Sequence, residues 1–242
     1  MLGVFVNVGT ILLGSAVGLI FKKGISAKFT DAVMIGIGLC TVLIGIQGIA
    51  DGMLKGQNVL VTIISMVLGA IVGTAIDIDR RLNGIGDSLS KKLSKKDSGK
   101  GNFAQGFVTA SLVFCVGSMT IVGSLESGLE GDHTTIYTKS LLDLFSSMML
   151  SASLGAGVIF AALFVLLFQG GLVLASGFLA PVLSDGAIAE ITSVGALLIF
   201  TLGLNLTGIG KFKVANYLPA IFFSPLVYYG FQFLGRYVPA FA

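Results

Sequence analysis

The residues that are best suited to chemistry lie within positions 131–170. A loop that contains Asp132 and His133 leads into a long apolar run, and this run carries Lys139 and Asp143. Residues four apart share one face of a helix, so these two charges can pair. A charge at the centre of a membrane helix costs roughly 2.5 to 3.5 kcal/mol on insertion scales and by default marks a functional site. Asp143 is therefore a candidate ligand for a cation, a proton or a charged substrate; the alternative is a purely structural ion pair with Lys139.

Further polar and small residues lie in the apolar segments. Hydroxyl groups near a helix start can coordinate ions, but they also bond back to the helix backbone. Buried amides can line a polar path, but they also join helices by hydrogen bonds. With Asp143 and Lys139, the predicted substrate or ion pathway comprises Ser140, Ser146, Ser147, Gly155, Gly157, Gln169, Asn205, Gln47 and Asn7.

The loop with Asp132 and His133 is a second candidate site. A His beside an Asp can sense pH or bind a metal, although a lone His in a polar loop is more often simply solvated. Glu126 and Glu130 lie nearby, but no second His and no Cys follows at zinc spacing, so no metal and no cofactor is predicted. Phosphate-loop, nucleophile-elbow and zinc-protease motifs are also absent. The sequence therefore favours a protein that is not an enzyme and assigns no catalytic residue.

The composition is that of an integral membrane protein. Of the 242 residues 55% are hydrophobic and 11% are charged, and the mean hydropathy is +0.97, unlike any average soluble domain. Several apolar runs reach the roughly 20 residues that cross a bilayer as a helix. We predict one all-α polytopic domain over residues 1–242, with the lipid bilayer as partner. No basic face interleaved with aromatic residues is present, so no nucleic-acid partner is expected.

Eight apolar segments are predicted, although two of them have unusual lengths. The segment 137–168 is too long for one untilted crossing, and Gly155 to Gly157 is its expected break point. The segment 171–183 is short, so it is a tilted crossing, a half-helix or a re-entrant piece. The predicted segments are 3–21, 31–50, 59–76, 107–124, 137–168, 171–183, 191–206 and 215–233, the first read as a retained helix and not as a removed signal.

The distribution of Lys and Arg favours eight crossings. If every segment crosses, one side receives Lys22, Lys23 and Lys28, all basic residues of the cytoplasmic loop 79–104, Lys211 and Lys213. Only Lys55, Lys139 and Arg236 lie opposite, as the positive-inside rule predicts. A re-entrant sixth segment gives seven crossings and a weaker asymmetry. Within the basic loop, Leu82, Ile85, Leu89 and Leu93 have the spacing of an amphipathic surface helix, with a plain loop as the alternative.

Two patterns concern how the helices associate. Gly14 and Gly18, and likewise Gly69 and Gly73, are four apart, which provides small-residue faces for close helix packing and leads us to expect a homodimer. Residues 24–30 also resemble residues 186–192. This match pairs the halves 1–78 and 169–238 around a central segment, 105–168, as an inverted repeat with broken helices.

Several short motifs resemble those of one known family. They are Gly131-Asp132-His133, Lys139-Ser140, Asp143, Ser147, Leu154-Gly155, Gln169-Gly170 and Asn216-Tyr217-Leu218-Pro219-Ala220. Together they resemble the YqgA-like, or YdfK-like, family of uncharacterised bacterial inner-membrane proteins along the whole chain. The resemblance implies a multi-pass protein of the bacterial cytoplasmic membrane.

The function that these observations favour is a secondary transporter or channel for a small solute or ion. Its polar pathway is expected around the fifth and sixth segments. The alternative is an intramembrane enzyme or signalling component that uses the outer loop with Asp132 and His133.

Overall fold

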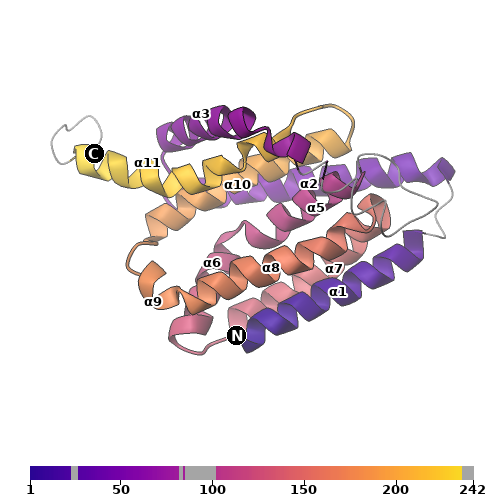
Figure 1. Ribbon diagram of the computed structural model, residues 1–242, viewed down its shortest axis with the longest axis horizontal. Coiled ribbons are helices and arrows are strands. Elements are labelled where there is room, and N and C mark those ends of the chain that lie inside the picture. Colours follow the sequence, from indigo (N-terminus) through magenta and orange to yellow (C-terminus); the bar gives the residue numbers. More distant parts are fainter. Residues whose placement is uncertain (23–26, 82–83, 85–101, 236–242) are drawn as a thin grey trace.

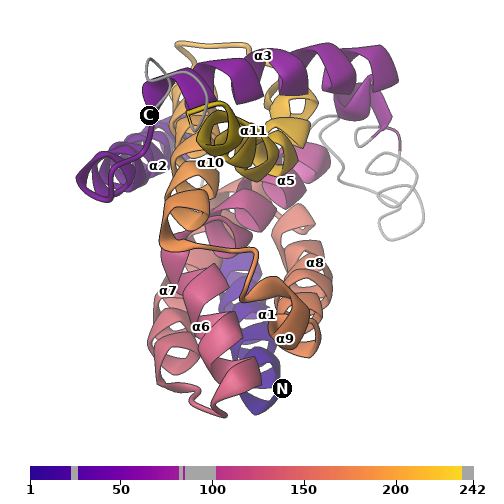
Figure 2. The same cartoon turned by 90° about the vertical axis from the view of Figure 1, so that its left-hand side faces the viewer.

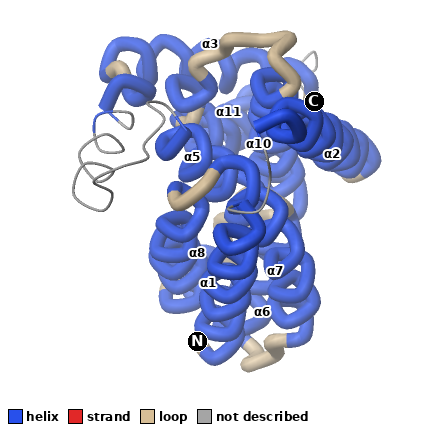
Figure 3. Tube along the Cα trace, turned by 90° about the vertical axis from the view of Figure 1, so that its right-hand side faces the viewer, coloured by secondary structure: helices blue, strands red, loops and turns tan. Residues whose placement is uncertain are grey.

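The computed structural model describes residues 1–22, 27–81, 84 and 102–235, and these residues form helices and connecting loops without a strand (Figure 3). The predicted all-α fold is confirmed. The helices are α1 (Leu2–Lys22), α2 (Ala27–Leu54), α3 (Val59–Ile76), α5 (Asn102–Cys115), α6 (Ser118–Leu129), α7 (Thr134–Leu154), α8 (Gly157–Leu174), α9 (Ser176–Leu179), α10 (Asp185–Leu206), the 3-10 helix η1 (Val214–Tyr217) and α11 (Pro219–Gly235).

Among the described residues, five helices are long and apolar enough to cross a membrane. They are α1, α3, α8 and α10, together with residues 35–54 of α2. A sixth candidate is the pair α5–α6, whose two helices are bent by 57° against each other. Large apolar side chains such as Leu13, Leu43, Ile71 and Leu167 are exposed on these helices, as expected where a helix faces lipid. The protein is a polytopic helical membrane protein.

The helices form two groups that meet in the middle of the molecule (Figures 2 and 3). The α1 group contains α1, α6, α7 and α8, and the α10 group contains α2, α3, α10 and α11. The helix α5 lies between them and packs against α8. An apolar core that includes Ile11, Phe114 and Leu154 fills the space between α1, α5, α7 and α8.

Within the α1 group, α1 and α7 lie side by side in the same direction. Gly3 faces Ile136 near the start of both helices, and Gly18 faces Ser151 near their ends. A β-carbon at Gly14 would overlap the Leu144 carbonyl oxygen. The predicted small-residue face on the first helix is therefore confirmed, because glycine lets the two backbones approach this closely.

Within the α10 group, the paired helices run in opposite directions. Gly38 near the start of α2 faces Thr207 after the end of α10, whereas Gly52 near the end of α2 faces Ser193. The helices α3 and α11 are antiparallel in the same way, with the predicted packing glycine Gly69 against Ala220. Gly73 faces the backbone of Asn216 just before α11, so both predicted faces are used inside one chain.

These directions make the described chain pass eight times between two ends of the molecule, with α5–α6 counted as one pass. The ends of α1 and α10, the start of α2 and the turn between α7 and α8 lie at the right-hand end in Figure 1. The N-terminus, the turn between α6 and α7, α9 and the last described turn of α11 lie toward the opposite end. We call these the α2-start end and the N-terminal end.

The eight passes differ from the predicted segments at the fifth and sixth positions. The run 137–168 is not one span: it contains most of α7 and α8, which turn back at Gly155, whose φ of +82° suits glycine. The segment 171–183 does not cross, because it ends α8, forms the short α9 and leads into α10 on the same side. The prediction that this segment crosses is wrong. The broken helix pair lies instead at α5–α6.

The basic residues remain asymmetric in this arrangement. Lys22 ends α1, Arg80 follows α3, and Lys211 and Lys213 follow α10, so these residues belong to the α2-start end. Lys55 follows α2 and belongs to the other end. The predicted amphipathic segment around Leu82 to Leu93 and the lysines at 91–100 are outside the described residues. We expect the α2-start end to face the cytoplasm.

Reporter fusions test this orientation. Alkaline phosphatase inserted after Gly131 is expected to be active, because this residue lies at the N-terminal end. A fusion after Ala242 is also expected to be active, because it follows α11, which leads to that end. An insertion near Lys95 is expected to be inactive. Green fluorescent protein fusions at the same positions should give the reverse pattern. A fluorescent, phosphatase-negative C-terminal fusion would contradict the orientation.

Candidate functional site

The break between α5 and α6 is the first element of the site. Gly117 adopts φ +153° and ψ +146°, a conformation that is essentially restricted to glycine. The Thr120 hydroxyl spans the break and donates a 3.0 Å hydrogen bond to the Phe114 carbonyl. Among the described residues, no side chain makes a capping hydrogen bond at the start of α6. The first backbone N–H groups of α6 therefore give this end of the helix a partial positive charge inside the bundle.

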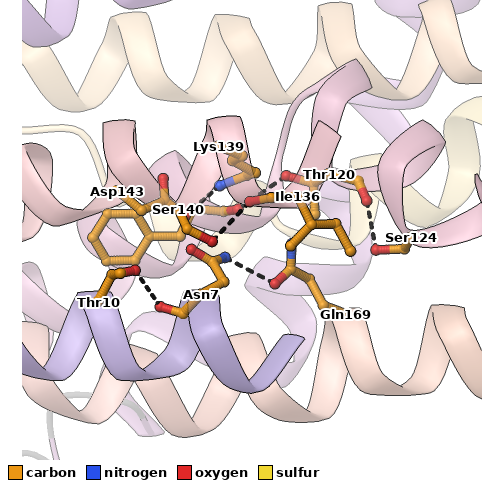
Figure 4. A network of polar contacts seen from close by, with 10 residues as sticks. Asn7, Thr10, Thr120, Ser124, Ile136, Lys139, Ser140, Asp143 and Gln169 are labelled. Atoms are coloured by element: carbon orange, nitrogen blue, oxygen red, sulfur yellow. Dashed lines mark hydrogen bonds and ion pairs between the residues drawn. The ribbon is translucent and has the colours of Figure 1, made fainter. Parts of the chain in front are cut away.

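The second element is the ion pair of Lys139 and Asp143 on α7. The two side chains are bonded to each other and are only 7% and 6% exposed. The helix α7 begins at Thr134 and not at the predicted residue 137. Asp143 therefore lies roughly 13 Å from the start of the helix, deeper than the sequence prediction implied. The predicted pairing is confirmed. The pair is buried in the helix bundle and does not lie at its surface (Figure 4).

A cavity of about 360 Å³ brings these two elements together. It lies where α6 and α7 of the α1 group face α2 and α10 of the α10 group, so its walls come from segments far apart in the sequence. Its polar lining consists of Lys139, Asp143 and Ser146 of α7, Thr120 of α6, Gln47 and Asp51 of α2 and Thr192 of α10, with Gly117 at the helix break.

A buried pair of amides on α1 and α8 lies next to Asp143. The Asn7 side chain on α1 donates a 2.9 Å hydrogen bond to Gln169 Oε1 on α8. The Asn7 side chain also interacts with the Asp143 carboxylate, and Figure 4 shows its hydrogen bond to Gln169. Asn7 Oδ1 and Gln169 Nε2 make no hydrogen bond to any described residue. This pair fixes α1 and α8 around the carboxylate, but neither amide lines the cavity.

The other predicted pathway residues separate into two sets. Ser146 and Gln47 line the cavity. Ser140 and Ser147 donate to the carbonyl groups of Ile136 and Leu144 of their own helix, at 2.7 and 2.9 Å, as the structural alternative predicts.

Three further predicted pathway residues form turns and do not line the cavity either. Gly155 and Gly157 form the turn between α7 and α8, where Gly157 packs against the Phe103 backbone. The Asn205 amide makes two hydrogen bonds, of 2.8 and 2.9 Å, to the backbone of Phe212. Each of these residues shapes a turn at the α2-start end.

The outer loop is explained by local structure at the start of α7. Asp132 accepts a 2.8 Å hydrogen bond from the Thr134 backbone N–H, and this bond lowers the pKa of the Asp132 carboxyl group. The His133 ring lies 2.8 Å from the Ser127 hydroxyl through Nδ1 and packs edge-on against Tyr137. Asp132 therefore bonds to the backbone and does not orient the imidazole, so Ser127 and His133 do not form a catalytic triad with it.

Sequence reasoning missed three residues that the fold places in or near the site. Thr120 is a single hydroxyl in an apolar run. Asp51 lies one position beyond the predicted segment 31–50, although it belongs to α2 and lines the cavity. Glu190 was left one position outside its predicted span, yet it is a fully buried residue of α10. The available signal was a carboxylate next to an apolar run.

Comparison with known proteins gives one consistent result. Residues 2–229 match the family described as "Protein of unknown function (DUF554)". The chain is 36% identical over 227 residues to the "Uncharacterized membrane protein YdfK" of Bacillus subtilis, which covers 94% of this chain and 95% of that protein. It is 27% identical over 226 residues to the "Uncharacterized protein YqgA" of Escherichia coli, covering 91% and 93%. No solved structure matches the chain.

Proposed function

The chain belongs to the DUF554 family, and we propose that it acts as a secondary transporter or channel for a small solute or ion. The observation that carries this proposal is the cavity that contains a buried ion pair and a helix break inside a membrane protein. Charged groups are costly inside a membrane, and they are retained mainly along substrate or ion pathways.

The position of the break supports a transport site. In many transporters, a discontinuous helix ends near the middle of the membrane, where the free N–H groups of one half bind anionic groups and the free carbonyls of the other coordinate cations. Here α5 and α6 separate at Gly117, which lines the same cavity as Lys139 and Asp143. The binding site that we propose therefore lies between α2, α6, α7 and α10, and not at the short segment 171–183.

The charges around the cavity limit the chemical class of the solute. Lys139 and the start of α6 favour a negative group, whereas Asp143 and Asp51 favour a positive one. We propose an ion or a small solute with charged groups. An uncharged hydrocarbon would gain no electrostatic stabilisation from this lining and would displace the water that solvates its polar groups.

The alternative, an enzyme or signalling component at the outer loop, is less well supported, because the hydrogen bonds of Asp132 and His133 are accounted for by the start of α7. We propose that the protein is located in the bacterial cytoplasmic membrane, since both named relatives come from bacteria. The homodimer and the inverted repeat of residues 1–78 and 169–238 remain predictions.

The proposal is tested by flux. Purified protein is screened by thermal shift against inorganic ions, amino acids and organic acids, and each stabilising compound is then measured for uptake into liposomes. Ser146→Leu, which fills part of the cavity, is expected to lower uptake at least about tenfold, because a bulky side chain occupies the space of the solute.

Phe145→Leu is the matched control, because Phe145 is the neighbouring residue on α7 and its side chain is exposed. Its uptake should equal that of the unmodified protein. Uptake no faster than in protein-free liposomes for every compound, or equal uptake by the Ser146 and Phe145 variants, would contradict the proposal.

A further inference from the structure

Glu190 is a second acidic group inside the protein, and it lies apart from the lining of the cavity. It is 0% exposed and lies five residues after the start of α10. It forms no ion pair with another described residue. A carboxylate in such surroundings requires either a proton or a cation. The question is which group supplies that charge.

The hydrogen bonds of Glu190 leave one oxygen free. Oε1 accepts a 2.5 Å hydrogen bond from the backbone N–H of Asn58, in the turn between α2 and α3. Oε2 makes no hydrogen bond to any described residue. The Thr62 hydroxyl also faces the carboxyl group, but it donates to Gln57 Oε1 at 3.2 Å. The carboxyl group is thus held by one oxygen and open at the other.

Three further side-chain oxygen atoms belong to neighbouring positions of the fold. The Ser193 hydroxyl lies one helical turn further along α10 and also has no hydrogen-bond partner among the described residues. The Thr62 hydroxyl of α3 faces the carboxyl group and is bonded to the Gln57 amide oxygen. Carboxylate, amide and hydroxyl oxygens are the ligands that hard cations prefer.

The site is also close to the aqueous phase. Asn58, which donates to Glu190, is itself exposed at the N-terminal end of the molecule. An ion therefore has to pass only the turn between α2 and α3. Asn58 also begins α3, where its side chain accepts a 2.9 Å hydrogen bond from Leu60 N–H, so binding at Glu190 acts directly on the start of that helix.

We propose that Glu190 binds a monovalent cation, a proton or Na⁺, from the N-terminal end. In the proton case the proton adds to Oε2 and gives a neutral carboxylic acid, while Oε1 still accepts from Asn58. In the Na⁺ case Oε2 is a ligand together with neighbouring oxygens. The inference rests on the proposed transport function, in which this cation is the coupling ion.

Other titratable groups lie at the same end and have to be separated from Glu190. Asp51 is on the last turn of α2 and Lys55 follows the end of that helix. Asp185 begins α10, and Tyr228 and Tyr229 of α11 pack against the start of α10. Asp185 is the suitable control, because it is a carboxylate of the same helix at its exposed start.

The first experiment needs no transported solute. Infrared difference spectra of the purified protein are recorded during pH titration and during exchange of choline chloride for NaCl at constant ionic strength. A carboxyl band that changes with pH and is absent in Glu190→Gln but present in Asp185→Asn supports proton binding. A change and a thermal stabilisation that require Na⁺, again lost only in Glu190→Gln, support Na⁺ binding. If the unmodified protein shows no carboxyl band beyond those that Glu190→Gln also shows, in either titration, the proposal is wrong.

The second experiment separates this inference from transport itself. Glu190→Gln keeps the acceptor for Asn58 but can bind neither ion as a carboxylate does. If proton coupling is correct, flux of the unmodified protein falls about tenfold per pH unit above the point of proton loss, and the variant loses this dependence. Unchanged pH and Na⁺ dependence of flux in the variant would overturn the inference and leave the transport function standing. Absence of flux in the unmodified protein together with Glu190-dependent cation binding would reject transport and retain the cation site.

Discussion

Asp143→Asn is expected to abolish flux while the protein stays folded. Asn keeps the size of the side chain and its contact with Asn7, but it removes the charge that lines the cavity. If the carboxylate binds the transported ion or the charge of the solute, uptake should fall to the level of protein-free liposomes. The measurement is initial uptake in liposomes, with the amount of folded protein checked by size-exclusion chromatography.

Two further variants separate function from structure. Glu130→Gln changes an exposed carboxylate near the start of α7 and should have no effect on uptake. If the pair is only structural, Asp143→Asn leaves Lys139 buried and unpaired and costs about 3 to 5 kcal/mol of stability. The double variant Asp143→Asn with Lys139→Gln should then recover stability. Recovery of both stability and uptake in the double variant would show that Asp143 has no role in transport.

Gly73→Leu is expected to cause the largest loss of stability. A β-carbon at this position would overlap the Asn216 carbonyl oxygen, which is backbone and cannot rotate away. The Asn216 side chain in turn accepts a 2.8 Å hydrogen bond from the Asp79 N–H, so moving this segment breaks a second contact. Overpacking of this kind costs about 1 to 3 kcal/mol or more, and a Leu side chain adds to the overlap. The expected result is a clearly lower melting temperature or aggregation in mild detergent.

Gly9→Leu is the matched control for this variant. Gly9 is also inside an apolar helix, but nothing lies within 4 Å of the position that its β-carbon would take. Its stability should be unchanged or slightly higher, because leucine favours a helix by up to about 1 kcal/mol relative to glycine. Equal stability of the Gly73 and Gly9 variants would show that α3 does not pack on α11 as described.

The family and the membrane character of this protein follow from short-range information. Hydropathy over about 20 residues predicts a membrane helix because each helix satisfies its own backbone hydrogen bonds, independent of its neighbours. The pairing of Lys139 with Asp143 was predictable for the same reason, since residues four apart always share a helix face. The packing faces at Gly14 and Gly73 were also visible as spacing, although their partner helices were not.

The turn at Gly155 shows where local information ends. A run of apolar residues interrupted by glycine fits both a kinked span and two antiparallel helices, and only the packing of α7 on α1 and of α8 on α5 distinguishes them. The error in segment 171–183 has the same cause. Whether a short apolar piece crosses depends on where the next helix begins, and α10 begins on the same side.

The sequence by itself determined which residues are chemically unusual: a buried charge pair, a polar loop and apolar helices with small-residue faces. Only the tertiary structure decided that Asp143 of α7 shares a cavity with Thr192 of α10 and with Gly117 at the break between α5 and α6. It also decided that Asn205 serves a turn and that Glu190 lies beneath the turn at Asn58. The physical reason is that intrahelical spacing is set by the backbone, whereas contacts between helices depend on direction and close packing along the entire chain.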